Sequence, residues 1–184
     1  MQPGDSELVR RARHGDEAAC HEMVDLYSTP LYRLAYSLVG NAADAEDVLQ
    51  ETFSGAFRSL RGFQERASLK TWLTRILMRQ AARCHRSRAR HRMAPLEAVQ
   101  ENPAGGRANS AAARSESDQG MKMDIMQELQ QLSPGHREVI VLREMQGMSY
   151  DEIAGALGVP RGTVESRLFR ARQELKERLK DYLP

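Results

Sequence analysis

Residues 148–175 read MSYDEIAGALGVPRGTVESRLFRARQEL, and this stretch decides the fold that we expect for the C-terminal third of the chain. Ser149 and Glu152 have the spacing of a capping box, which predicts a short helix over residues 150–157. Gly158-Val159-Pro160 predicts a turn, and a longer helix should follow from Arg161 to about Tyr182. A short helix, a glycine-containing turn and a longer helix form the layout of a helix-turn-helix.

The longer helix has one apolar and one polar face. Val164, Leu168, Ala171, Leu175 and Leu179 lie within a narrow angular range and should face the core. The opposite face presents Gly162, Ser166, Phe169, Arg170 and Gln173. Serine, arginine and glutamine reach base edges or phosphates, and a phenylalanine can contact a thymine methyl group. We interpret this face as a DNA-binding surface, and the alternative is a helical hairpin with a polar outer face.

The chain has 184 residues, of which 41% are hydrophobic, 28% charged and only 5% aromatic. Because helix-forming residues dominate, we expect an all-α protein. Residues 94–120 are rich in Ala, Gly, Ser, Asn and Pro, so they cannot bury enough apolar surface to offset the cost of ordering. We therefore expect two small helical domains, residues 1–93 and 121–184, joined by a flexible linker over 94–120.

Periodicity and capping residues predict four helices in the first block and one more before the helix-turn-helix. The expected ranges are 6–14, 17–39 with a bend at Pro30, 42–60, 68–90 with Ser68 as the N-cap, and 134–146 after an N-cap at Ser133. Residues expected inside the second and third helices are Met23, Leu26, Tyr27, Leu31, Leu34, Ala35, Leu38, Val48, Leu49, Phe53, Ala56 and Phe57.

Positive charge gathers between Arg66 and Arg92, where nine Lys or Arg residues occur without an acidic one. On the expected helix 68–90, five arginines form one row with Trp72 beside it: Arg75, Arg79, Arg83, Arg86 and Arg90. We call these five the arginine row. An aromatic ring among arginines suits stacking on unpaired bases while the arginines hold phosphates. The alternatives are a solvated charged face and a tryptophan packed under arginine stems.

Composition also argues against several classes of protein. Cys20 and Cys84 are too few for a disulfide scaffold, and no Cys or His spacing suggests a metal site. We expect no cofactor, because the chain has no Gly-rich phosphate loop and no nucleophile motif. We also expect no stable membrane insertion and a cytoplasmic location, since no apolar window reaches the length of a membrane span.

Three segments together resemble one known family. DAEDVLQETF (44–53), TWLTRI (71–76) and residues 148–175 resemble extracytoplasmic-function sigma factors, the minimal members of the sigma-70 family. The last segment is less specific alone, because response-regulator helix-turn-helix domains share its outline. The resemblance implies a non-enzymatic RNA polymerase subunit that binds core polymerase, recognises the −35 and −10 promoter elements and helps to melt the −10 region.

The resemblance also assigns residues. Docking on the clamp helices of the largest polymerase subunit falls to Asp44, Glu46, Asp47, Gln50 and Glu51. Binding and melting of the −10 element falls to Phe63, Gln64, Arg66, Ser68, Lys70, Thr71, Trp72, Arg75 and Arg79, and the arginine row adds Arg83 and Arg86. Reading of the −35 element falls to Arg161, Gly162, Thr163, Glu165, Ser166, Phe169 and Arg170, with Gln173 added from the polar face.

Glu165 departs from the family pattern, in which a basic residue is common at this position. A carboxylate cannot hold a phosphate, so it either accepts a hydrogen bond from a cytosine amino group or faces away from DNA. The resemblance further implies an anti-sigma factor as a partner, one that can hold the chain at the membrane, and a monomer when free. The rival hypotheses are a stand-alone helix-turn-helix regulator and, more weakly, a protein-binding adaptor.

Overall fold

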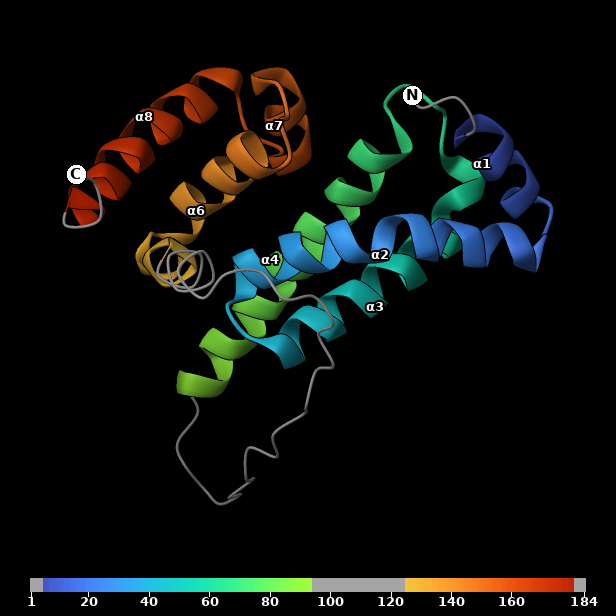
Figure 1. The fold of residues 1–184 in the computed structure, drawn as a ribbon, viewed down its shortest axis with the longest axis horizontal. Helices are drawn as coiled ribbons and strands as arrows, with labels where there is room; N and C mark the ends of the chain where they lie inside the picture. The colour runs from blue at the N-terminus through green and yellow to red at the C-terminus, as the bar shows by residue number, and fades with distance from the viewer. Residues whose placement is uncertain (1–4, 94–124, 181–184) are drawn as a thin grey trace, which may run out of the picture.

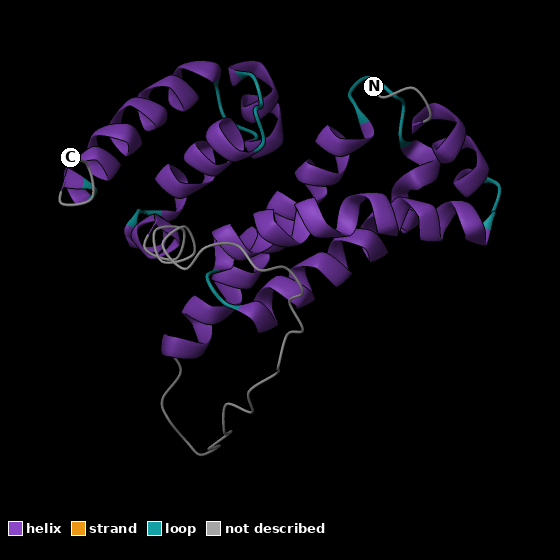
Figure 2. Cartoon of the chain, in the orientation of Figure 1, coloured by secondary structure: helices purple, strands orange, loops and turns teal. Residues whose placement is uncertain are grey.

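The computed structural model describes residues 5–93 and 125–180, and within these two ranges every regular element is a helix (Figure 2). This confirms the expected all-α fold. The expected linker, residues 94–120, lies outside the described residues.

Within residues 5–93, four α-helices and one 3-10 turn make up the N-terminal half, and the four α-helices are labelled in Figure 1. They are α1 (Asp5–Arg13), α2 (Glu17–Val39), α3 (Ala42–Ser59), η1 (Leu60–Gly62) and α4 (Leu69–Met93). Their ends follow the expected signals. Asp16 and Asn41 cap α2 and α3, and Gly40 ends α2 in the left-handed region with φ of 81°. Ser68 caps α4 by accepting a hydrogen bond from the Thr71 amide at 3.0 Å.

Helices α2, α3 and α4 pack on one another as a bundle, and α1 packs on α2 and η1. The bundle core comes from the expected apolar faces, with Met23, Leu34, Leu73 and Leu77 completely or almost completely buried. The prediction that Leu26 lies in the core is wrong, because this residue is 57% exposed. It precedes the buried Tyr27 in the sequence, and a neighbouring position lies about 100° away around a helix, so Leu26 falls at the edge of the buried face.

The C-terminal half starts with a helical segment over residues 125–131. It continues with α6 (Pro134–Ile140), η2 (Val141–Met145), α7 (Tyr150–Leu157) and α8 (Arg161–Arg178). Helices α6 and α7 both pack against α8. The buried residues of α8 are Val164, Leu168 and Ala171, as the sequence predicts, while Leu175 is only partly buried.

Two expectations about the start of this half need correction. The single helix expected over 134–146 changes after Ile140 into a π-helical segment, η2. Five residues of π-helix keep the same apolar residues inside, so the sequence pattern does not distinguish the two forms. Ser133 makes no capping bond with its side chain, and its backbone carbonyl accepts from the His136 and Arg137 amides instead.

The two halves lie against each other. Helix α4 packs on α7, and α2 packs on α6 and η2. Buried apolar residues from both halves form one continuous cluster, which runs from Leu8 on α1 to Ala171 on α8. The facing sides of α2, α4, α6, η2 and α7 therefore form a packed interface between the halves.

Candidate nucleic-acid and partner surfaces

The turn before α8 places the start of this helix at the surface. Both bonds of the capping box are present: the Ser149 side chain accepts from the Glu152 amide, and the Glu152 carboxylate accepts from the Ser149 amide. The hydrogen bonds that Ser149 donates lower the pKa of the Glu152 carboxyl. Gly158 ends α7 with φ of 67°, a left-handed conformation that favours glycine. Pro160 then begins α8 by accepting the Thr163 amide at 2.9 Å. The helix-turn-helix predicted from the sequence is therefore present in the structure.

The outer face of α8 forms a continuous exposed row. Phe169 is 65% exposed although it is a large apolar residue, so it does not serve the core. We call the exposed set the recognition row: Arg161, Gly162, Glu165, Ser166, Phe169, Arg170 and Gln173. The predicted DNA-binding residue Thr163 is half-buried at the edge of this row. A helix with buried aliphatic residues on one side and exposed Arg, Ser, Gln and Phe on the other has the chemistry for major-groove contact.

Arg161 is held by two carboxylates at the start of the recognition row. Its Nε donates to Glu165 Oε1 at 2.9 Å, and its Nη1 donates to Asp151 Oδ2 at 3.1 Å. The hydrogen bond to Glu165 and the charge of Asp151 raise the pKa of Arg161 above its ordinary value. The guanidinium also lies 5.9 Å from the Tyr150 ring centre. Glu165 thus has a partner within the protein, which the sequence alone did not indicate.

The acidic residues of α3 divide into two groups. Asp44 is bound within the fold: it accepts from Asn41 Nδ2 at 2.9 Å and pairs with Arg88 of α4 at 2.8 Å. The other predicted docking residues are exposed, namely Glu46, Asp47, Gln50 and Glu51. Of the five predicted docking residues, these four are therefore exposed to a partner, although Glu51 also lies 4.0 Å from Arg58 Nη2.

A groove of about 550 Å³ runs between α3 and α4 and joins the acidic residues to the arginine row. Asp47 and Glu51 line one side, and Arg83 and Arg90 line the other. Cys84 also lines the groove, and burial and the charge of Asp44 raise the pKa of its thiol. The predicted docking and DNA surfaces thus share a border, which their separation in the sequence did not show.

The loop after η1 is bound to α1 through Arg13. Phe63 is 5% exposed, and its ring lies 4.8 Å from that of Trp72. Arg13 donates to the carbonyls of Leu60 and Phe63 and pairs with Glu65. Sequence reasoning missed Arg13, because nothing near it in the chain indicates a contact with residues about fifty positions away.

The predicted −10 residues therefore differ in how they are presented. Phe63 faces inward and supports Trp72, whereas Gln64, Arg66 and Lys70 are exposed. Ser68 is used as the cap of α4. Arg79, Arg83 and Arg86 are exposed along α4, while Trp72 is half-buried.

Thr71 and Arg75 lie under the C-terminal half. Thr71 is buried, and its hydroxyl donates to Glu152 of α7 at 3.3 Å. The Arg75 Nε is buried and has no hydrogen-bond partner. Thr71 is therefore withdrawn from the exposed surface, whereas Arg75 is half-buried and only its Nε is completely covered.

Within residues 5–93 and 125–180, no three His, Cys, Asp or Glu side chains are placed to hold a metal ion. None of the helices in the same ranges is both long and apolar enough to cross a lipid bilayer.

Comparison with known proteins supports the resemblance seen in the sequence. Residues 23–91 match the family described as Sigma-70 region 2, and residues 122–175 match Sigma-70, region 4. The RNA polymerase sigma-H factor of Pseudomonas aeruginosa is 34% identical over 188 residues, which cover 99% of this chain and 97% of that protein. The ECF RNA polymerase sigma factor SigE of Mycolicibacterium smegmatis is 38% identical over 168 residues, and the match spans 90% of this chain but 64% of that relative.

Two solved structures share the fold. The sigma factor RpoE of Bartonella quintana, in complex with the anti-sigma factor NepR, has a TM-score of 0.66 and 30% identity, and the match covers 87% of this chain and 96% of that one. CnrH in complex with the cytosolic domain of CnrY has a TM-score of 0.70 and 27% identity, with 97% and 99% covered.

Proposed function

Because this chain belongs to the extracytoplasmic-function group of the sigma-70 family, we propose that it binds core RNA polymerase and directs it to specific promoters. The observation that carries this proposal is the recognition row, where Phe169 and Arg170 stand exposed on a helix whose other side is buried. We assign residues 121–184 to the −35 element and residues 1–93 to core polymerase and the −10 element.

The recognition row suits the major groove of duplex DNA. Arg170 and Gln173 are long enough to reach base edges, and the exposed ring of Phe169 suits contact with a thymine methyl group. Arg161 at the start of the helix suits a phosphate. If Arg170→Ala leaves both promoter affinity and sequence preference unchanged, this assignment is wrong.

The surface around Trp72 suits opened −10 DNA. Its ring is fixed against Phe63 at 4.8 Å, and Gln64 and Arg66 stand exposed beside it. Stacking of one unpaired base on an aromatic ring stabilises a complex by about 1–3 kcal/mol. This offsets part of the cost of unstacking, which is a few kcal/mol. Arg79, Arg83 and Arg86 then follow the phosphates of the separated strand.

The exposed carboxylates of α3 supply a docking surface for polymerase. We propose that Asp47 and Glu51, which face one groove, contact basic residues of the clamp helices, while Asp44 mainly holds α3 to α4 through Arg88. The chain acts as a specificity subunit with no catalytic site of its own, and it works in the cytoplasm. An anti-sigma factor is a natural partner, since the similar RpoE structure is a complex with the anti-sigma factor NepR.

Transcription in vitro tests the proposal. Core polymerase with and without the purified chain is incubated with genomic DNA of the source organism, and the 5′ ends of the transcripts are sequenced. The proposal predicts new 5′ ends that share two motifs at a constant spacing. A stand-alone regulator would bind DNA but yield no new start sites with core polymerase alone.

A further inference from the structure

The loop between η1 and α4 contains a residue in an unfavourable backbone conformation. Glu65 has φ of 55°, and within residues 5–93 and 125–180 it is the only residue other than glycine with a positive φ. The left-handed region is sterically costly for any residue that carries a Cβ atom, whereas glycine enters it freely. A strained residue of this kind persists only where surrounding contacts hold it, and such residues cluster at functional sites.

Helix α1 supplies the contacts that hold Glu65. Ser6 Oγ donates to Glu65 Oε2 at 2.8 Å, and Arg13 Nη1 donates to Glu65 Oε1 at 3.3 Å. Ser6 and Arg13 are seven residues apart, which is about two helical turns, so they lie on one face of α1. The connection from η1 to α4 passes beside the start of this helix (Figure 1). Both carboxylate oxygens of Glu65 are therefore bonded to α1.

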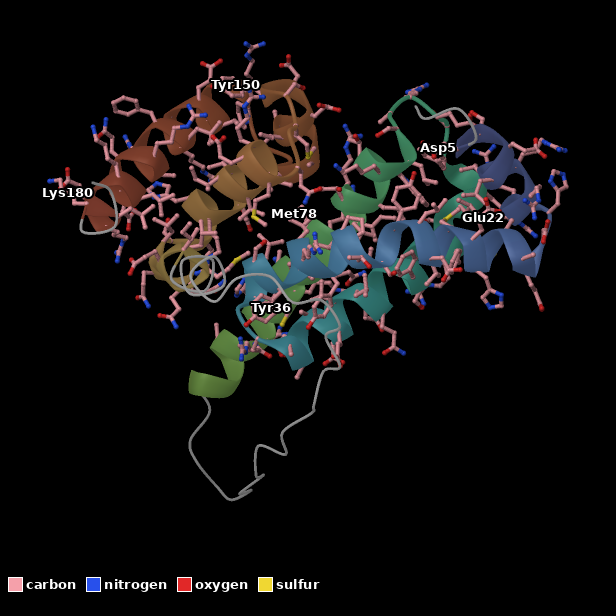
Figure 3. The ribbon with its side chains drawn as sticks, viewed as in Figure 1. Asp5, Glu22, Tyr36, Met78, Tyr150 and Lys180 are labelled. Carbon is pink, nitrogen blue, oxygen red and sulfur yellow. The ribbon has the colours of Figure 1, made fainter. Side chains whose placement is uncertain are left out.

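Another face of α1 is packed firmly on the bundle. Leu8, Val9 and Ala12 are buried there. Asp5, labelled in Figure 3 at the start of α1, is also buried and accepts from the Tyr27 hydroxyl of α2 at 2.8 Å. Because these contacts fix α1 on α2, the helix is a rigid support for the loop.

Arg13 also holds the backbone that leads to Glu65. Its Nε donates to the Leu60 carbonyl at 3.2 Å, and its Nη2 donates to the Phe63 carbonyl. The guanidinium carbon lies 6.0 Å from the centre of the Phe63 ring, which in turn lies 4.8 Å from the ring of Trp72. One side chain of α1 therefore sets the position of the loop backbone, of the Glu65 carboxylate and of the ring that supports Trp72.

The conformation of Glu65 determines which side chains the loop presents. Gln64 and Arg66, on either side of it, are exposed, while Phe63 is buried. The Glu65 carboxylate is paired with Arg13 and is 30% exposed, so its charge is compensated on a surface that would otherwise repel phosphates. If Glu65 relaxed to negative φ, the orientation of Gln64 relative to Arg66 would change.

We propose that Ser6 and Arg13 of α1, acting on Glu65, are positioning residues that fix the shape of the loop over 63–67 for an unpaired −10 base. The three residues contact one another and not the base. The inference rests on the proposed function, which assigns this loop to −10 DNA, and it makes α1 part of −10 recognition. The hold of α1 on the loop is also a property of the free chain, so it can be tested without DNA.

Tryptophan fluorescence tests the hold in the free, full-length chain. Trp72 is the only tryptophan in the sequence, and its ring rests on Phe63. Arg13→Gln removes the contacts that hold the loop, so acrylamide should quench Trp72 more efficiently and its emission should shift to longer wavelength. Arg10→Gln is the matched control, because it removes the same charge from α1 but breaks only an exposed pair with Glu7. Wild-type quenching in Arg13→Gln would refute the hold.

Two substitutions at Glu65 separate the backbone conformation from the carboxylate. Both lose the bonds to α1, but only Glu65→Ala keeps the steric cost of the left-handed region, which Glu65→Gly avoids. Strain of this kind shifts a conformational equilibrium by at least about fivefold. The variants leave the packed face of α1 intact, so they decide the matter even if Arg13→Gln disturbs the fold.

The readout is the affinity of reconstituted holoenzyme for a labelled single-stranded −10 oligonucleotide, measured by fluorescence anisotropy. Affinity should fall by at least about fivefold in Glu65→Ala, because the bound shape of the loop is less populated, and clearly less in Glu65→Gly. An equal loss in both variants would show that the carboxylate itself contacts DNA, and would overturn the positioning role.

Base preference separates positioning from a general loss of stability. The same holoenzymes are titrated with oligonucleotides that carry the −10 motif or each other base at one of its positions. Arg13→Gln and Glu65→Ala should bring the affinity ratio between the preferred base and the others toward one at one position, while affinity for a −35 duplex stays unchanged. An equal loss for every base and for the −35 duplex would mean a merely structural role and would overturn the proposal.

The results also distinguish this inference from the proposed function. If the chain yields no start sites with core polymerase but Arg13→Gln exposes Trp72 as expected, the proposed function fails and the hold of α1 on the loop stands. If start sites appear and neither quenching nor base preference changes in Arg13→Gln and Glu65→Ala, the proposed function stands and the positioning role is refuted.

Discussion

The contact between Glu165 and Arg161 makes a sharp prediction about the recognition row. Glu165→Gln removes a carboxylate that accepts from Arg161 at 2.9 Å, while the bond from Arg161 to Asp151 remains. The released Arg161 can then hold a DNA phosphate. One additional phosphate contact steepens the dependence of log K on log salt by about 0.9. Because exposed ion pairs contribute little, the loss of this competing pair should raise affinity by no more than roughly fivefold.

The assay is fluorescence anisotropy of the reconstituted holoenzyme with two duplexes of equal length, measured over a series of KCl concentrations. One duplex carries the −35 motif found by 5′-end sequencing, and the other carries a scrambled motif. Glu165→Gln should bind both more tightly by a similar factor. Glu177→Gln on the same helix is the control, because it removes an equal charge that pairs with Lys180 instead. A loss confined to the −35 duplex, of about 1–3 kcal/mol, would show that Glu165 reads a base.

Three further predictions test the other surfaces. The double change Asp47→Lys and Glu51→Lys should weaken binding to core polymerase by at least about tenfold, because it reverses the charge of the docking surface; surface plasmon resonance with unchanged affinity would contradict the docking proposal. Trp72→Ala should reduce permanganate-reactive thymines at −10 by about tenfold, from the loss of one stacked base, and equal reactivity would remove its melting role. Burial and the positive charge of Arg137 lower the pKa of His85, whose ordinary value is 6.5. The stabilisation of the folded state by the neutral side chain is therefore complete above about pH 6.5 and lost as the pH falls below it, so the free energy of unfolding measured by urea denaturation should be lower at about pH 5.5. His85→Gln should flatten this response, and a wild-type chain that does not respond to pH would contradict it.

The acid response depends on groups from four helices around His85, namely α2, α3, α4 and α6. Arg137 and Arg88 oppose its protonation, whereas Asp44 and the Leu38 carbonyl favour it. Burial is the largest influence on the pKa of His85, so the fold favours the neutral form of this side chain.

Local signals in the sequence predict the helices and most of the buried faces. The capping box at Ser149, the glycine that ends α2 and the serine that caps α4 all act within four residues of their partners. The recognition row follows from helical periodicity alone, because Val164, Leu168 and Ala171 fix which side of α8 faces inward. Such features need no knowledge of distant contacts.

Contacts between distant segments are what the sequence does not predict. Arg137 and the Leu38 carbonyl are 99 residues apart, and Gln130 and the Ser37 carbonyl are 93 apart. No periodic pattern marks such a pair. The same reason explains why Phe63 turns inward, why Asp44 is bound to Arg88, and why part of the arginine row is covered. The roles assigned to individual residues in promoter and polymerase binding stay predictions.

The most direct test of the central claim is transcription start-site mapping with purified core polymerase. Addition of the chain should create start sites that share −35 and −10 motifs, and Arg170→Ala should reduce or shift them while Glu177→Gln should not. If the chain binds DNA yet core polymerase gains no new start sites, the account of this protein as a promoter-directing subunit is contradicted.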